Sequence, residues 1–98
     1  MKPLIIRSVA EVDIAEATQW LDQERSRDVA LSFLDAIDTT FRQIREHPRM
    51  FAIVEQEFRR APVAGFAYGV FYIDGPDVIS VTAVMHASRD PATWKRRL

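Results

Sequence analysis

The sequence contains no cysteine, and among its 98 residues there are only three glycines and two histidines. Without cysteine the chain can form neither disulfides nor thiolate metal sites. Three glycines do not supply a glycine-rich phosphate loop or a nucleophile elbow. The two histidines, His47 and His86, have no partner at a metal-ligand spacing. We therefore expect no metal and no cofactor.

Long apolar runs are also missing. The longest apolar segments fall far below the ~20 residues that a membrane span needs, and Met1–Arg7 is too short to be a signal peptide. We expect a cytoplasmic protein without membrane contact. A chain of 98 residues can bury one modest core, so residues 1–98 are predicted to form a single domain.

The small net charge of −1 hides an uneven distribution of charge along the chain. Residues 8–38 hold eight acidic residues and two arginines, a local charge of −6, which leaves +5 for the remainder. A basic side could bind nucleic acid or an acidic protein, whereas an acidic helix face is commonly just solvated. The charge pattern alone leaves both readings open.

Two consecutive helices are predicted in the first half of the chain. Ser8 and Glu11 match a capping box, and an apolar stripe follows at helical spacing. Ser26 is the expected N-cap of a second helix of about 20 residues that stops before Pro48. Its expected core stripe is Ala30, Phe33, Leu34, Ile37, Phe41 and Ile44.

The rest of the chain has strand character. Residues 2–7 read as a short edge strand, and further strands are expected at 58–61, 68–73 and 78–85, the last three as an antiparallel meander. The predicted fold class is α+β, with the order β-α-α-β-β-β. A helical hairpin packs on a mainly antiparallel four-stranded sheet, and a short C-terminal segment follows Pro91.

Alternation along the strands predicts which side chains face the hairpin. Ile79, Val81, Ala83 and Met85 should face it, with Phe71 and Ile73 from the preceding strand. The opposite, open face should then carry Tyr68, Val70, Tyr72, Ser80, Thr82, Val84 and His86. Either Arg59 or Arg60 joins that face, since neighbours on one strand point in opposite directions.

Eight residues are therefore candidates for binding a target: Arg59, Arg60, Tyr68, Tyr72, His86, Arg89, Trp94 and Arg96. Arginine binds phosphate or carboxylate bidentately, tyrosine can stack on bases, and histidine can act as a general base.

Each candidate also has a purely structural interpretation. The arginines of the middle strand could pair with Glu55 or Glu57, and both tyrosines could pack in the core or against a partner. His86 could order the loop that follows its strand. Arg89 could pair within the chain beside an Asp-Pro turn, Trp94 could pack the tail on the sheet, and Arg96 could only aid solubility.

Several segments, taken in order, resemble the RelE/ParE toxin superfamily of bacterial toxin–antitoxin systems, and the ParE-like branch most. They are DIAEATQWL (13–21), FLDAID (33–38), HP (47–48), FRRAPVAGFAYGVFY (58–72) and VTAVMHASRDPATWKRR (81–97). The resemblance implies the toxin of a plasmid-stabilization type of system, neutralised by a cognate antitoxin that wraps it. Because a surface built to hold another chain tends to associate, homodimers or heterotetramers with the antitoxin are also expected. ParE-like members inhibit DNA gyrase through protein contacts. RelE-like members cut mRNA on the ribosome, and a non-toxic antitoxin-binding relic is a third option.

Two features of the chain depart from a ribosome-dependent nuclease. Trp94 stands near the place where such members carry a C-terminal tyrosine, and an indole cannot transfer a proton. The pI near 6.1 is low for a protein that grips RNA phosphates. The resemblance therefore favours a gyrase inhibitor that is not an enzyme over an endoribonuclease.

Overall fold

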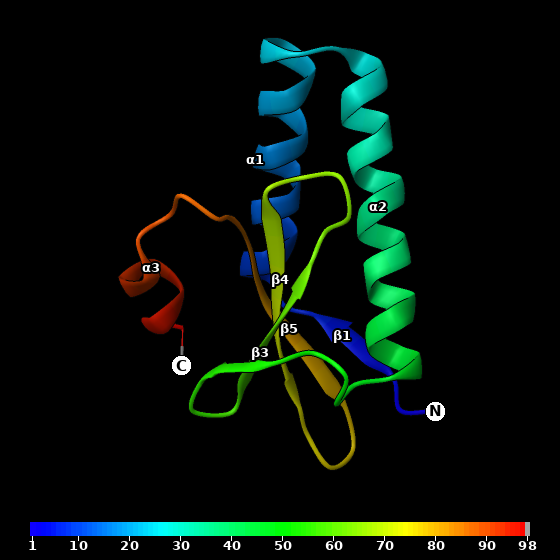
Figure 1. Ribbon diagram of the computed structural model, residues 1–98, viewed down its shortest axis with the longest axis vertical. Helices are drawn as coiled ribbons and strands as arrows, with labels where there is room; N and C mark the ends of the chain where they lie inside the picture. The colour runs from blue at the N-terminus through cyan, green and yellow to red at the C-terminus, as the bar shows by residue number, and fades with distance from the viewer. Residues whose placement is uncertain (98) are drawn as a thin grey trace.

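The computed structural model describes residues 1–97, which form a five-stranded sheet with a long helical hairpin on one face (Figure 1). The elements in chain order are β1 (Leu4–Ile6), α1 (Ser8–Glu24), α2 (Arg27–Glu46), β2 (Ile53–Glu55), β3 (Phe58–Pro62), β4 (Tyr68–Asp74), β5 (Ile79–His86) and α3 (Pro91–Lys95). The sheet order is β1-β5-β4-β3-β2. The α+β class, the hairpin and the antiparallel meander are as predicted from the sequence.

The sheet differs from the prediction in strand number and in direction. The short strand β2, which the sequence pattern did not indicate, pairs antiparallel with β3 and adds a fifth strand. β1 lies at the opposite edge, as predicted, and pairs in parallel with β5, so the sheet is mixed.

The two long helices begin in different ways. Ser26 caps α2, because its hydroxyl accepts a hydrogen bond from the Val29 N–H at 3.1 Å. Ser8 does not cap α1: the N-cap is Arg7, without a side-chain bond, so the predicted capping box is not formed. Leu34 also departs from its predicted core position and is partly exposed on the outside of the hairpin.

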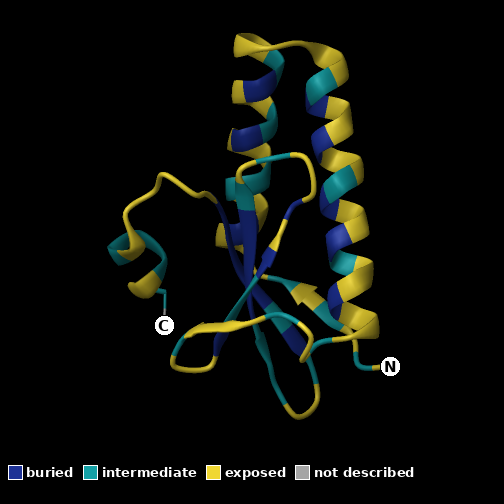
Figure 2. Ribbon diagram, in the orientation of Figure 1, coloured by how far each residue is buried: buried dark blue, intermediate teal, exposed yellow. Residues whose placement is uncertain are grey.

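The sheet buries side chains on both faces. The main core lies between the hairpin and the sheet, while a smaller cluster on the opposite face consists of Phe58, Phe71, Ala83 and Met85 with Ile73 and Trp94 packed against it. Figure 2 shows the buried centre of the sheet and the inward stripes of both long helices in dark blue. Helix α3 covers the second cluster, on the side away from α1 and α2 (Figure 1).

A bulge in β5 explains part of a wrong face prediction. The pairing passes from Phe71 opposite Ala83 to Tyr72 opposite Val81, so Thr82 is the extra residue. Ile79 and Val81 therefore face the hairpin as predicted, and Ser80 and Thr82 line a pocket on the open side.

Beyond the bulge the faces of β5 are exchanged. Ala83 and Met85 join the cluster under α3, while Val84 packs in the main core and His86 lines a cleft beside α1. The predicted faces of these four residues are therefore wrong, because an extra residue shifts the alternation by one position.

The predicted faces of β4 are reversed throughout. Tyr68, Val70 and Tyr72 pack toward the hairpin, whereas Phe71 and Ile73 lie in the second cluster. The cause is burial on both sides of this strand: apolar character then no longer distinguishes the core face from the open face.

Candidate functional site

The eight candidate residues do not share one surface. They fall into three groups: one beside the loop after α2, one on the open face of the sheet, and one in a cleft between α1 and the ends of β4 and β5. The arrangement of each group indicates what its side chains can do.

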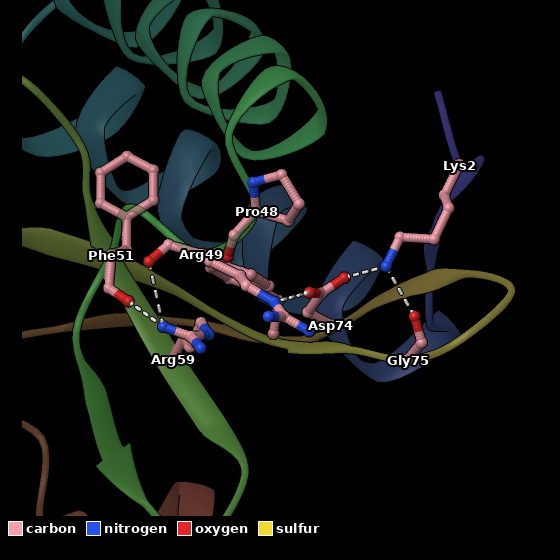
Figure 3. Close-up of polar contacts among 8 residues, drawn as sticks. Lys2, Pro48, Arg49, Phe51, Arg59, Asp74 and Gly75 are labelled. Atoms are coloured by element: carbon pink, nitrogen blue, oxygen red, sulfur yellow. Dashed lines mark hydrogen bonds and ion pairs between the residues drawn. The ribbon is translucent and has the colours of Figure 1, made fainter.

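Arg59 and Tyr72 hold the loop that joins α2 to β2. Figure 3 shows the contacts of Arg59 with this loop. One terminal nitrogen of Arg59 donates to the carbonyl oxygens of Phe51 at 2.7 Å and Arg49 at 3.2 Å. The Tyr72 hydroxyl donates to the Pro48 carbonyl at 2.6 Å. The hydrogen-bonding groups that these two side chains could offer to a target are thus already bonded to the loop backbone.

Burial controls the ionisation of this tyrosine. It raises the pKa of Tyr72 to about 12, although the nearby Arg59 guanidinium opposes the shift. The phenol is therefore a neutral donor at physiological pH. Next to it, Asp74 on β4 forms ion pairs with Lys2 and, at 3.6 Å, with Arg49, which joins the N-terminus to the same loop (Figure 3).

Arg60 and Trp94 lie on the open face, and Arg60 is thus the member of the arginine pair that points there. The Trp94 indole stacks on Phe71, with ring centroids 4.6 Å apart, and the Arg60 guanidinium carbon lies 5.9 Å from the centroid of the same ring. Trp94 packs the C-terminal segment on the sheet, which is one of the structural roles considered for it. Arg96, just after α3, is exposed.

Tyr68, His86 and Arg89 meet in a cleft of about 490 Å³ beside α1. The rings of Tyr68 and His86 are perpendicular, with centroids 5.1 Å apart. Burial raises the pKa of Tyr68, and the charge of Arg89 partly offsets that rise. Trp20 and Glu16 complete the exposed wall on α1.

His86 orders the loop after β5. Its Nδ1 accepts a hydrogen bond from the Ser88 backbone N–H at 3.0 Å and lies 2.8 Å from the Ser88 hydroxyl oxygen. The lone pair of Nδ1 is thus already engaged by the loop backbone and is not free to accept a proton from a substrate. The structural role considered for this histidine is therefore the one that the geometry supports.

Sequence reasoning missed an ion pair that fixes the C-terminal segment. Asp13 on α1 accepts from both terminal nitrogens of Arg97, at 2.6 and 3.2 Å, and also from the Val84 N–H at 3.0 Å. Arg97 donates further to the Thr82 carbonyl at 3.0 Å. The Asp13 carboxylate thus provides an acceptor for a backbone N–H of β5 beyond the point where its pairing with β1 ends. No local pattern could reveal a pair of residues 84 positions apart.

Sequence reasoning also missed a groove on the outside of the hairpin. It has a volume of about 510 Å³, and its apolar floor includes Ile14, Leu31 and Leu34. Leu31 is 53% exposed. The charged residues of the lining are Glu11, Asp22 and Arg27, of which the last two form an ion pair at 2.7 Å. The signal in the sequence was Leu31 beside the predicted stripe of α2, with Leu34 three residues later.

The family model described as "ParE toxin of type II toxin-antitoxin system, parDE" matches residues 4–91. The chain belongs to the ParE toxin family. A solved structure described as the chromosomal ParDE TA system from P. aeruginosa has the same fold, with a TM-score of 0.77 at 11% sequence identity. The similarity covers 88% of this chain and 96% of that one. No curated protein matches the sequence.

Membership of the ParE family confirms the predicted resemblance and implies an antitoxin partner. The matched range includes Asp13, both long helices and all five strands, and it ends at the first residue of α3. Within the described residues, no group of histidine and acidic side chains has the arrangement of a metal site. No helix among residues 1–97 combines the length and the hydropathy that crossing a membrane requires.

Proposed function

We propose that this ParE toxin acts in the cytoplasm by inhibiting DNA gyrase through protein–protein contacts, and that an antitoxin neutralises it by occupying the hairpin groove. The observation that carries the proposal is the family match over residues 4–91. Its support from geometry is the dispersal of the candidate residues: Arg59 and Tyr72 bind loop carbonyls, and Trp94 is packed on Phe71. A nuclease face that grips RNA would need such groups together and accessible.

The charge of the hairpin supports the assignment of the groove. An apolar floor of Ile14, Leu31 and Leu34 fits the apolar side of an amphipathic segment. Among the charged residues of the lining, Glu11 and Asp22 outnumber Arg27, which pairs with Asp22 at 2.7 Å, so the remaining negative charge favours a segment that is basic on its polar side. A chain segment of this kind in the antitoxin would bury Leu31, which is otherwise exposed on the long helix. Two such complexes in a heterotetramer are compatible with this binding mode.

The target is tested with purified protein in a gyrase supercoiling reaction. We expect the toxin to block supercoiling and expect the mRNA of induced cells to show no new codon-phased 5′ ends. Unchanged supercoiling together with growth arrest would contradict the gyrase assignment. Arrest without either effect would leave a different protein as the target, and induction without arrest would identify an antitoxin-binding relic.

A ribosome-dependent endoribonuclease is the second candidate, favoured by one observation. The cleft beside α1 gathers Tyr68, His86 and Arg89, which are side chains that can stack on bases and bind phosphate. New codon-phased ends that disappear in Arg89→Ala would establish this alternative. The substitution is suited to the purpose because Arg89 is exposed and its loss does not disturb the core.

The groove is tested with two equally exposed apolar residues of the hairpin. Leu31→Asp places a charge in the groove, whereas Val12→Asp changes a residue of α1 that is 54% exposed and does not line it. We expect Leu31→Asp to weaken antitoxin binding about 100-fold, as expected at the centre of an interface, and Val12→Asp to change it little. Equal effects of the two substitutions would argue against the groove.

A further inference from the structure

We propose that the edge strand β2 and the loop before it form a contact between two copies of this chain, paired antiparallel about a twofold axis near Ile53. This self-association depends on neither the gyrase nor the antitoxin proposal. Three features of residues 49–57 carry it: an edge without a neighbouring strand, exposed apolar side chains on a rigid loop, and a charge pattern that complements itself.

The edge position supplies the backbone groups for pairing. β2 ends the strand order β1-β5-β4-β3-β2 and has β3 as its one neighbour in the described sheet. A strand in that position directs a row of N–H and C=O groups outward. The opposite edge, β1, is less available because the start of α1 follows it immediately.

The side chains on this edge are apolar and exposed. Met50 is 59%, Ile53 55% and Val54 42% exposed, three large apolar residues within five positions (Figure 2 shows most of this segment as exposed). Single exposed apolar residues are ordinary on a protein surface, but a cluster on an unpaired strand is a surface suited to association.

The same segment is held in place from behind (Figure 3). Arg59 donates to the carbonyls of Arg49 and Phe51, and Tyr72 donates to the carbonyl of Pro48, the residue just before the segment. Because the loop is already ordered, association costs little additional conformational entropy. The sheet thus holds Met50 and Ile53 rigidly in solvent, instead of folding them inward.

The charges select a second copy as the occupant. The segment RMFAIVEQE (49–57) begins with a cation, has an apolar centre and ends with Glu55 and Glu57. Arg49 and Glu57 lie in the turns that flank the three-residue strand β2. An antiparallel contact about a twofold axis at Ile53 places the turn with Arg49 of one copy near the turn with Glu57 of the other, and the axis repeats the match. Parallel pairing would instead align the like charges. The Arg49 side chain is 85% exposed and can reach outward while it remains near Asp74.

The test reverses each charge in turn and then mixes the two variants. Sedimentation of the full chain at concentrations up to about 100 µM measures the fraction of dimer. We expect a dimer of the unaltered chain. Arg49→Glu and Glu57→Arg should each weaken it about tenfold, because each places like charges opposite one another. An equimolar mixture of the two variants should restore the dimer as a mixed species, since each cation again meets an acid.

Three results would overturn the proposal. One is a monomer at the highest concentration. Another is a dimer whose stability neither reversal changes, or whose mixed species is no tighter than the separate variants. The third is a dimer that Leu31→Asn abolishes, which would place the contact on the hairpin. Circular dichroism of each variant tests whether loss of the dimer results from unfolding of the chain. Ile53→Asn should weaken the dimer independently of charge.

Discussion

At the scale of single residues, the polar side chains of the sheet mainly fix loops and chain ends. Arg59 and Tyr72 order the loop after α2, and Asp74 joins that loop to Lys2. Asp13 binds the tail through Arg97. Arginine and tyrosine invite a functional interpretation in the sequence, but their partners here are backbone carbonyls. Only the three-dimensional arrangement decides between these roles.

The buried phenol of Tyr72 makes stability depend on alkaline pH. Its pKa is raised to about 12 in the folded chain, whereas the unfolded phenol titrates near about 10. The unfolded state therefore loses this proton first, so the contribution is complete below about pH 10 and is lost as pH rises toward about 12. Urea unfolding of the unaltered chain and Tyr72→Phe from about pH 8 to 11 should show the difference between them shrinking.

The phenylalanine variant also measures the hydrogen bond itself. At neutral pH, Tyr72→Phe should cost about 1 kcal/mol, because the Pro48 carbonyl loses its donor. Tyr68 remains in both proteins, so its own raised pKa cancels in the comparison. Stability differences that stay constant across this pH range would contradict the assignment of the alkaline loss to Tyr72.

At the scale of elements, the sequence predicts both long helices and four of the five strands, but neither the short strand β2 nor the face that a strand residue takes. The 3–4 spacing from Ala30 to Ile44 indicated α2 because one face of this helix meets the core and the other meets water. β4 is buried on both faces and β5 contains a bulge, and neither condition can be read from alternation.

Helix α3 is short, and we expect its attachment to depend on Trp94. The indole stacks on Phe71 and contacts the second apolar cluster, with Lys95–Glu55 at 3.0 Å as an exposed ion pair beside it. Trp94→Ala should lower the free energy of unfolding by about 2 kcal/mol, less than for a fully buried tryptophan, and Trp94→Phe by less. Guanidinium unfolding measures both.

The chain contains its own control for this experiment. Trp20 on α1 is 53% exposed, so Trp20→Ala removes an indole of the same size from solvent and should change stability by less than about 0.5 kcal/mol. Similar losses for the two alanine variants would mean that α3 does not stabilise the sheet through Trp94.

At the scale of the whole molecule, the fold followed from the sequence more completely than the site did. The hairpin, the edge position of β1 and the meander arise from local periodicity and short connections. The surfaces arise from contacts between distant segments: the groove needs α1 beside α2, and Asp13 reaches Arg97 only when the sheet has formed. Residue spacing therefore predicted the helices and strands that carry these residues, but not which residues meet at the surface.

The separation of charge across the molecule makes a final prediction about the antitoxin complex. Residues 8–38, which form α1 and much of α2, carry −6, and a basic segment bound there is attracted at long range. Raising the salt concentration from about 0.05 to 0.5 M should weaken binding about tenfold or more, since screening shortens to a few ångströms. Calorimetric titration at several salt concentrations measures this dependence.

Two substitutions, each of which removes one negative charge, locate the source of the electrostatic attraction. Glu11→Gln removes an acid at the rim of the groove and should reduce the salt dependence, whereas Asp77→Asn, between β4 and β5, removes the same charge far from the hairpin and should leave it unchanged. If both substitutions act equally, the net charge of the toxin governs the attraction. If neither acts and salt has no effect, the antitoxin is held by apolar contacts alone, and the acidic face of the hairpin has no part in its capture.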